Sequence, residues 1–174
     1  MYEKNESQVE STNADGLKKL AKMIEGISLA MLTTVDDRGI LRSRPMATQQ
    51  AEFDGTLWFF TKESSGKSDE VKRDSHVNVA YSDNHRHSYV SASGDAQIVR
   101  DGAKMKELWN PFVAAWFPKG LEDPELCLLK VNVSEAEYWD APASRMVQLI
   151  KMATGALTGK PPQMGNHEKL QIKA

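Results

Sequence analysis

Short apolar segments separated by turn-forming residues constrain the fold of this chain more than any other feature. Residues 27–35 reach the turn sequence Asp36-Asp-Arg-Gly39, and residues 40–53 reach a second turn at Asp54-Gly55 before the segment 56–61. Aspartate and glycine between apolar runs favour tight turns that join neighbouring strands. The first third of the chain is therefore predicted to form three strands in a meander.

Further strands are predicted at residues 76–82, 88–99, 126–132 and 136–139. Gly94 lies inside the second of these and indicates a β-bulge or a close backbone approach. Meandering strands avoid exposed edges when their sheet closes on itself. We therefore expect a mainly β fold with short helices (α+β), built as an antiparallel barrel or a strongly curled sheet.

Short helices are predicted around these strands. Apolar residues recur at helical spacing from Leu17 to Ile24 and stop at Gly26, which suits a helix C-cap. The other predicted helices cover residues 64–74, 102–109 and 144–157, and an irregular aromatic connection is expected at 116–124.

The composition fits one cytoplasmic domain. For a chain of 174 residues we expect a flexible arm at 1–14, one domain at 15–157 and a loose tail at 158–174. Lys and Arg number 22 against 24 Asp and Glu, so the net charge of −2 offers no field that would attract nucleic acid or an anionic membrane. One cysteine, no visible secretory signal and no apolar run of membrane-spanning length lead us to expect a reducing, cytoplasmic setting.

Two segments place cations where an anion could bind. Arg42 and Arg44 lie two residues apart on a predicted strand, so both side chains point to the same face. The segment 61–67 brings Ser65 and Lys67 to the start of a predicted helix, where backbone N–H groups favour a phosphate. Solvated arginines, and a capping serine beside a solvated lysine, are the alternative interpretation.

Two other patterns carry less weight. Gly66-Lys67-Ser68 matches the end of a Walker loop, but Thr61 stands where that loop needs glycine. His85 and His87 could reach one metal ion, yet no further ligands are identifiable. We therefore reject nucleotide hydrolysis and expect no metal site.

Several short motifs follow one another in a recognisable order. They are Arg44-Pro-Met46, Phe60-Thr61, Ser65-x-Lys67 and Tyr138-Trp-Asp140, joined by Trp116-Phe-Pro-x-Gly120 and Asp123-Pro124. Their order and spacing resemble the pyridoxamine 5'-phosphate oxidase-like flavoproteins, and more closely the bacterial general stress protein branch. The similarity covers residues 15 to 160, and no single motif is specific.

This resemblance implies an antiparallel split β-barrel, the FMN-binding split barrel, that works as a homodimer. Each of two FMN sites would lie at the subunit interface and draw residues from both chains. The cluster of aromatic residues at 109–117 also favours a dimer, because a short exposed helix and loop should need fewer. Packing inside one subunit is the alternative for that cluster.

The resemblance also assigns a phosphate end to the flavin site. By position, Arg44 and Lys67 would hold the phosphate, and Ser65 and Thr61 would donate hydrogen bonds to phosphate or ribityl oxygens. Two cationic side chains suit a phosphate group.

The ring end of the site is implied in the same way. The backbone of Pro45 and Met46 would line the edge of the isoalloxazine, Gln49 would stand near where the oxidases place a lysine, and Phe60 would pack beside the ring. Trp139 matches an aromatic residue that the oxidases contribute from the partner chain. FAD or a deazaflavin remains an alternative cofactor.

The chain departs from the oxidases at two points. Gly66 replaces the first of two basic residues that follow their serine, and only Arg145 remains of the basic, histidine-containing run that grips pyridoxal phosphate. Oxidation of vitamin B6 is therefore not supported. Flavin storage or delivery, reduction of a small acceptor with NAD(P)H as reductant, and a structural dimer with an empty cleft stay open.

Overall fold

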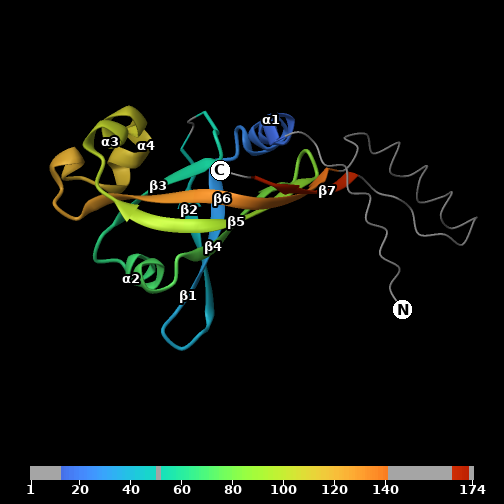
Figure 1. The fold of residues 1–174 in the computed structure, drawn as a ribbon. Coiled ribbons are helices and arrows are strands. Elements are labelled where there is room, and N and C mark those ends of the chain that lie inside the picture. Colours follow the sequence, from blue (N-terminus) through green and yellow to red (C-terminus); the bar gives the residue numbers. More distant parts are fainter. Residues whose placement is uncertain (1–12, 50–51, 141–165, 173–174) are drawn as a thin grey trace, which may run out of the picture.

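The computed structural model describes residues 13–49, 52–140 and 166–172, and these form one curled antiparallel sheet with short helices at its ends (Figure 1). The strands are β1 (Leu29–Val35), β2 (Leu41–Ala47), β3 (Thr56–Lys62), β4 (His76–Asp83), β5 (Ser88–Val99), β6 (Leu126–Asp140) and β7 (Asn166–Gln171). The helices are α1 (Asn13–Ile24), α2 (Gly66–Arg73), α3 (Gly102–Leu108), α4 (Pro111–Trp116) and a single 3-10 turn, η1 (Gly120–Glu122).

The strand order is β2-β1-β4-β5-β6-β3, with β7 paired to β6, and every pairing is antiparallel. Among the described residues no ladder joins β2 to β3, so the sheet curls without closing. This architecture confirms the predicted mainly β, antiparallel split barrel.

The curl is centred on the long strand β6. Its first half pairs with β3, its second half pairs with β7, and β5 lies along its other edge. The β5–β6 register shifts between Ser93 and Gly94, and a Cβ at Gly94 would lie 2.1 Å from the backbone oxygen of Asn132. The predicted bulge or close approach at Gly94 is therefore confirmed on both counts.

Alternation along the strands builds the core. On β1 and β4 every second side chain points into the curl, so Leu32 and Val79 are fully buried, and Phe59 of β3 is buried in the same core. Helix α1 covers one end of this core with Leu20 and Met23, as its spacing predicts.

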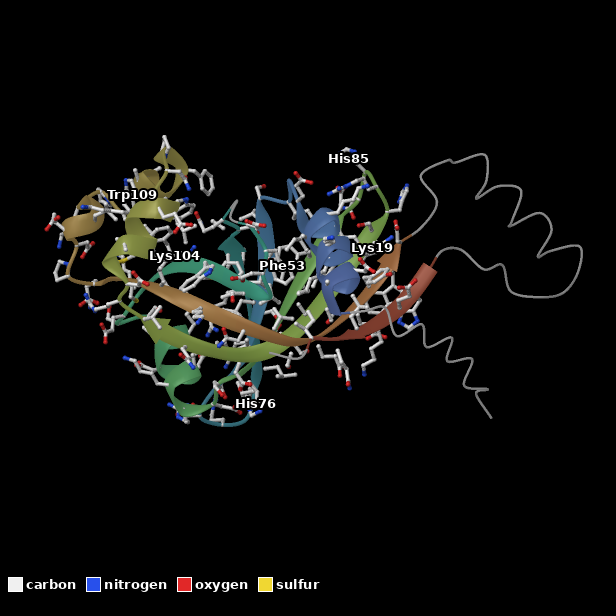
Figure 2. The ribbon with its side chains drawn as sticks, turned by 45° about the horizontal axis from the view of Figure 1, so that its top comes forward. Lys19, Phe53, His76, His85, Lys104 and Trp109 are labelled. Atoms are coloured by element: carbon white, nitrogen blue, oxygen red, sulfur yellow. The ribbon has the colours of Figure 1, made fainter. Side chains whose placement is uncertain are left out.

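A second apolar cluster fills the end beneath α3 and α4. It joins Leu108, Val113 and Phe117 to Phe60 on β3 and Leu128 on β6. Figure 2 shows Trp109 in this layer, far from Lys19 of α1 at the other end of the sheet.

The structure differs from the sequence-based expectation at four places. Strand β2 ends at Ala47, although the segment expected there runs to residue 53. Residues 126–140 form one continuous strand rather than two, and 111–116 form α4. Residues 166–171, expected to be loose, pair along β6 as β7. The helix expected at 144–157 lies outside the described residues.

Candidate functional site

A cavity of about 510 Å³ lies between the end of β2, the end of β3, the start of α2 and helix α4. Seven of the nine residues proposed for the flavin site line it: Pro45, Met46, Gln49, Phe60, Thr61, Ser65 and Lys67. The other lining residues are Leu29, Ala47, Lys62, Phe112, Val113, Trp116 and Phe117. Arg44 and Trp139 are not among them.

One end of the cavity is polar because β3 ends there and α2 begins. The Ser65 hydroxyl lies 3.3 Å from that of Thr61 and 2.9 Å from that of Ser68, and Ser68 donates to the Lys62 carbonyl at 2.8 Å. Ser65 is the N-cap residue of α2, but its side chain makes no capping hydrogen bond. The N–H of Ser68 donates to the Ser65 carbonyl at 2.8 Å, whereas those of Gly66 and Lys67 have no acceptor among the described residues and are left for another one.

Lys67 brings the positive charge to this polar end. Its side chain is half-buried in the wall of the cavity and makes no hydrogen bond or ion pair with any described residue. Burial lowers the pKa of the Lys67 ammonium, and the nearby Arg44 charge lowers it further. A cation held in this way gains from a bound anion, which would restore its pKa.

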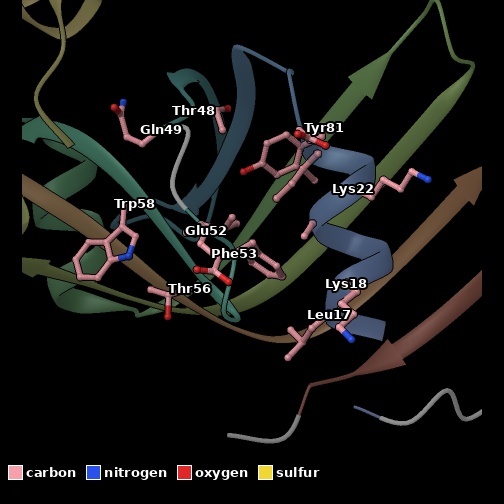
Figure 3. Close-up of a pocket in the computed structure, with 14 residues that line it drawn as sticks. Leu17, Lys18, Lys22, Thr48, Gln49, Glu52, Phe53, Thr56, Trp58 and Tyr81 are labelled. Atoms are coloured by element: carbon pink, nitrogen blue, oxygen red, sulfur yellow. The ribbon is translucent and has the colours of Figure 1, made fainter. Parts of the chain in front are cut away.

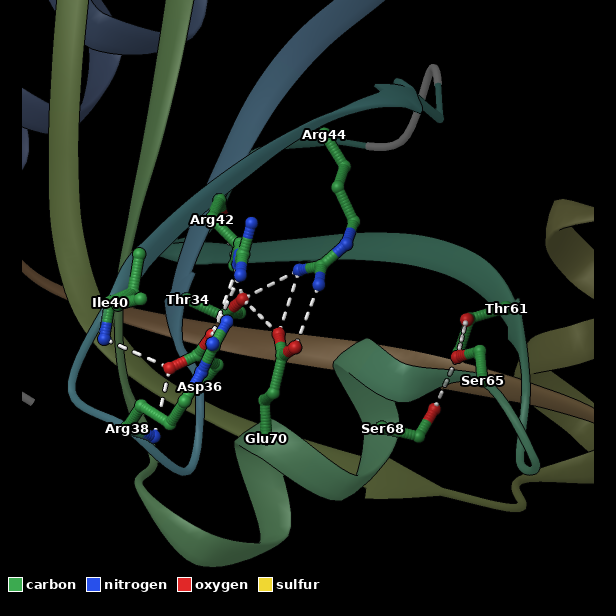
Figure 4. Close-up of polar contacts among 10 residues, drawn as sticks. All are labelled: Thr34, Asp36, Arg38, Ile40, Arg42, Arg44, Thr61, Ser65, Ser68 and Glu70. Carbon is green, nitrogen blue, oxygen red and sulfur yellow. Dashed lines mark hydrogen bonds and ion pairs between the residues drawn. The ribbon is translucent and has the colours of Figure 1, made fainter.

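Arg44 lies at the edge of this site and is anchored to its own chain. Its two terminal nitrogens donate to the two carboxylate oxygens of Glu70, each at 2.7 Å, and one also donates to Thr34 Oγ1 at 2.7 Å (Figure 4). The hydrogen bond from Arg44 lowers the pKa of Glu70, with a second contribution from Thr34. Arg44 thus joins β2 to β1 and α2.

Arg42 has a carboxylate partner of its own. It contacts Asp36 with its Nε at 3.1 Å, beside the turn in which Asp36 also accepts the backbone N–H groups of Arg38 and Ile40. The two arginines share one face, as predicted, but the sequence did not show which carboxylates they meet. Glu70 was missed, although its position one turn after Lys67 on a helix with Val71 buried could have suggested an inward carboxylate.

The end of the cavity next to α4 is mainly apolar. Gln49 donates to the Ala47 carbonyl and accepts from Asn110 Nδ2, both at 3.1 Å. Asn110 also caps α4 by accepting the N–H of Val113, so α4 fixes the Gln49 carboxamide. Phe60 packs edge-on against Trp109 with ring centroids 5.7 Å apart.

Trp139 lies near the C-terminal end of β6, in the part of that strand that pairs with β7. Its indole stacks on His167 with centroids 5.1 Å apart and an interplanar angle of 8°. Its side chain remains 40% exposed. Trp139 does not line the cavity of its own chain.

A second cavity of about 570 Å³ lies under α1, beside the segment after β2 (Figure 3). Gln49 is the residue that it shares with the first cavity, and the Tyr81 and Thr48 hydroxyls near it are buried without a hydrogen-bond partner. Burial raises the pKa of Tyr81. Apart from Gln49, none of the residues proposed for the flavin site line it.

The described part of the chain also bears on metal binding, on membrane-spanning helices and on the cysteine. No group of three His, Cys, Asp or Glu side chains there could hold a metal ion. No helix among these residues is long and apolar enough to cross a membrane. Cys127 is buried, which raises the pKa of its thiol.

Comparison with known proteins agrees with this architecture. The profile of the family described as pyridoxamine 5'-phosphate oxidase like matches residues 15–163. Protein bli-3 of Neurospora crassa is 32% identical over 155 residues, which cover 83% of this chain and 74% of that protein.

Solved structures show the same fold. A protein assigned as general stress protein 26 from Jannaschia sp. CCS1 has a TM-score of 0.74 at 25% identity, over 91% of this chain and 99% of that one. The general stress FMN/FAD binding protein of Xanthomonas citri has a TM-score of 0.65 at 29% identity, over 75% of this chain and 92% of that one.

The open, curled antiparallel sheet, with a cavity between its edge strands β2 and β3, defines a split-barrel protein. The chain belongs to the pyridoxamine 5'-phosphate oxidase-like family, in its general stress protein branch.

Proposed function

We propose that this protein binds FMN in the cavity between β2, β3, α2 and α4, and that a second copy of the chain completes the site. The observation that carries the proposal is Lys67, a half-buried cation without an acidic partner among the described residues, placed beside the uncapped start of α2. A phosphate monoester supplies the anion that both features lack.

The polar end of the cavity fits the phosphate. Lys67 would provide the charge, the free N–H groups of α2 would donate, and the Ser65 and Thr61 hydroxyls would donate to phosphate or ribityl oxygens. Arg44 would approach from the rim of the same end.

The apolar end fits a flat ring. Pro45 and Met46 would present the edge of β2 to the isoalloxazine, Phe60 would pack beside it, and the fixed Gln49 carboxamide would hydrogen-bond to it. The Xanthomonas citri relative is described as FMN/FAD binding, which supports a flavin here. FAD and deazaflavins share the ring and a phosphate and are compared in the experiment below.

An exposed apolar face beside the cavity supports a homodimer. Leu29 and Met31 are 54% and 42% exposed on β1, and their cross-strand partners on β2 are Ala47 and Pro45. Cross-strand partners share a face of the sheet, so these side chains form one apolar strip that reaches the cavity wall. Such a strip beside a polar rim is typical of an interface, and it would let Trp139 of the second copy approach the flavin.

We favour flavin binding over catalysis. The described residues that line the cavity include no Asp, Glu, His, Tyr or Cys, so Lys67 is the titratable group best placed in it. A bound flavin supplies hydride and electron transfer by itself, so slow reduction of a small acceptor by NAD(P)H is the alternative. Steady-state NAD(P)H oxidation no faster than that of free FMN would rule it out.

The test is a titration with FMN, followed through tryptophan fluorescence and flavin absorption, in parallel with riboflavin, FAD and a phosphorylated deazaflavin. Trp116 and Trp109 stand at or beside the cavity, so we expect saturable quenching by FMN. Replacing Trp116 with Phe should remove part of the quenching while FMN still binds. A folded dimer that shows no quenching and no flavin bands would contradict the proposal.

A further inference from the structure

The Arg44 guanidinium uses only part of its hydrogen-bonding capacity in this structure. An arginine carries five N–H donors in a planar fork. Nη1 donates to Thr34 and to Glu70 Oε2, and Nη2 donates to Glu70 Oε1, so three donors are used. The Nε–H and the second Nη2–H donate to none of the described residues, and they lie along one edge of the guanidinium.

This free edge faces the polar end of the cavity. In Figure 4 the carboxylate of Glu70 and the hydroxyl of Thr34 occupy one side of the guanidinium, and Nε lies on the side toward Thr61 and Ser65. An edge with two parallel N–H donors matches two oxygens of a phosphate. Arg44 therefore has a complete fork left for an oxyanion after it has paired with Glu70.

The groups that hold Arg44 are themselves well fixed. Glu70 is 9% exposed and Thr34 is 1% exposed, and Thr34 donates to Glu70 Oε2 at 2.6 Å. The three residues come from α2, β1 and β2, so the hydrogen bonds fix the guanidinium relative to the start of α2. Without them a long arginine side chain would lose rotamer freedom on binding, which weakens binding.

We propose that Glu70, together with Thr34, is a positioning residue that aims the free edge of Arg44 at the phosphate of the ligand. This inference rests on the proposed function and adds a determinant of phosphate recognition to it. Glu70 does not touch the ligand, and it acts through Arg44.

The direction in which Glu70→Gln changes FMN affinity distinguishes positioning from simple electrostatics. Glu70 is an anion close to the proposed phosphate, so electrostatics alone predicts that Glu70→Gln strengthens FMN binding. Positioning predicts the reverse, because the amide keeps one acceptor for Arg44 and loses the bidentate pair. The two accounts therefore differ in the direction of the change.

The experiment measures FMN and riboflavin affinity for Glu70→Gln, Thr34→Val and Arg44→Lys, with thermal unfolding of each variant. We expect FMN affinity to fall about tenfold for Glu70→Gln and Arg44→Lys and severalfold for Thr34→Val. Riboflavin, which lacks the phosphate, should bind each variant as it binds the wild type. Asp69→Asn removes an exposed neighbouring charge on α2 and should not weaken FMN binding.

Inorganic phosphate, added alone in a thermal-shift assay, separates this inference from the flavin proposal. Stabilisation of the wild type by phosphate that Glu70→Gln reduces supports the role of Glu70 even if FMN does not bind. Unchanged or tighter FMN binding by Glu70→Gln overturns the role of Glu70 and leaves the flavin proposal intact. An equal loss of riboflavin and FMN would make Glu70 merely structural, and a wild type that binds neither FMN nor phosphate overturns both.

Discussion

At the scale of single residues, the proposed site depends on how each cation is neutralised. Arg42 and Arg44 form ion pairs with carboxylates of this chain, whereas Lys67 forms none with a described residue and feels Glu70 only at longer range. Lys67 is therefore the cation whose electrostatic environment a bound anion would change most. The arginines contribute shape and orientation.

Replacing Lys67 with Met should reveal this difference. A charge-assisted hydrogen bond to phosphate is lost, so we expect FMN affinity to fall about ten- to hundredfold while riboflavin affinity stays the same. Fluorescence titration measures both. Lys72→Met, which removes an exposed lysine of α2 paired with Glu63, is the matched control, and an equal effect there would indicate general electrostatics instead.

The pH dependence of FMN binding follows from the same residue. The phosphate gains its second charge near pH 6, so affinity should first rise with pH. The lowered pKa of Lys67 means that the free protein loses this charge below the usual lysine range, and affinity should then fall as pH rises through that value. In Lys67→Met the fall at high pH should disappear, and its persistence would assign it to another group.

The sequence predicts the contiguous part of the site better than the part made by packing. Ser65 and Lys67 are neighbours at a helix start, so their convergence with Thr61 follows from local structure. The Arg44–Glu70 pair cannot be read in this way, because it needs α2 to pack against β1 and β2 in one particular register. A pattern of charges along the chain does not contain that information.

At the scale of elements, turns and close approaches decide how the sheet is built. Apolar runs bounded by turn residues predict β1, β3, β4 and β5 closely, whereas β2 ends at Ala47 and not at the predicted residue 53. Strand β7 was not predicted, since it is separated from β6 by residues 141–165 and its pairing is fixed by contacts such as Ala136 with Leu170. Helix α4 was not predicted, because its cap Asn110 and residues 111–115 lie between the helix expected at 102–109 and the connection expected at 116–124.

The turn between β1 and β2 depends on the charge of Asp36. Backbone N–H of Ile40, and then of Arg38, lowers the pKa of Asp36 to about 2, with a further contribution from Arg42. A carboxylate whose pKa is lowered on folding stabilises the fold at pH values above its pKa in the unfolded chain. That stabilisation is lost as the pH falls toward about 2. We expect Asp36→Ala to lower the melting temperature at pH 6 and to match the wild type near pH 2, whereas Asp37→Ala should change little at either pH.

The β5–β6 register depends on the missing side chain at Gly94. A Cβ there would lie 2.1 Å from the Asn132 oxygen and 2.9 Å from Val133 Cα, and backbone cannot move away cheaply. We expect Gly94→Ala to reduce the free energy of unfolding by about 3 kcal/mol in urea denaturation. Gly102→Ala, in α3 with open space around it, should be neutral or stabilising by about 0.5–1 kcal/mol. A tolerated Gly94→Ala would contradict this strand pairing.

At the scale of the whole molecule, the cavity and the apolar strip on β1 and β2 form one continuous surface. Leu29 and Pro45 line the cavity and also lie on the strip that continues to Met31. A flavin bound here by one chain would leave part of the ring against solvent. A second copy placed on the strip would cover the ring and the strip at once, which makes binding and dimerisation one coupled equilibrium.

Placing a charge on this strip should therefore separate the subunits and release the flavin together. Met31 is 42% exposed and can accept Glu without a change in the core, so the variant Met31→Glu should fold. Buried in an interface, however, the carboxylate would lose its hydration without a partner, and we expect sedimentation to show a monomer whose FMN affinity is reduced at least tenfold. Ala103→Glu, on the exposed start of α3, should remain a dimer with normal affinity. A Met31→Glu dimer would place the interface elsewhere, whereas a Met31→Glu monomer with full FMN affinity would show that one chain holds the flavin alone and that Trp139 of a second copy is not needed.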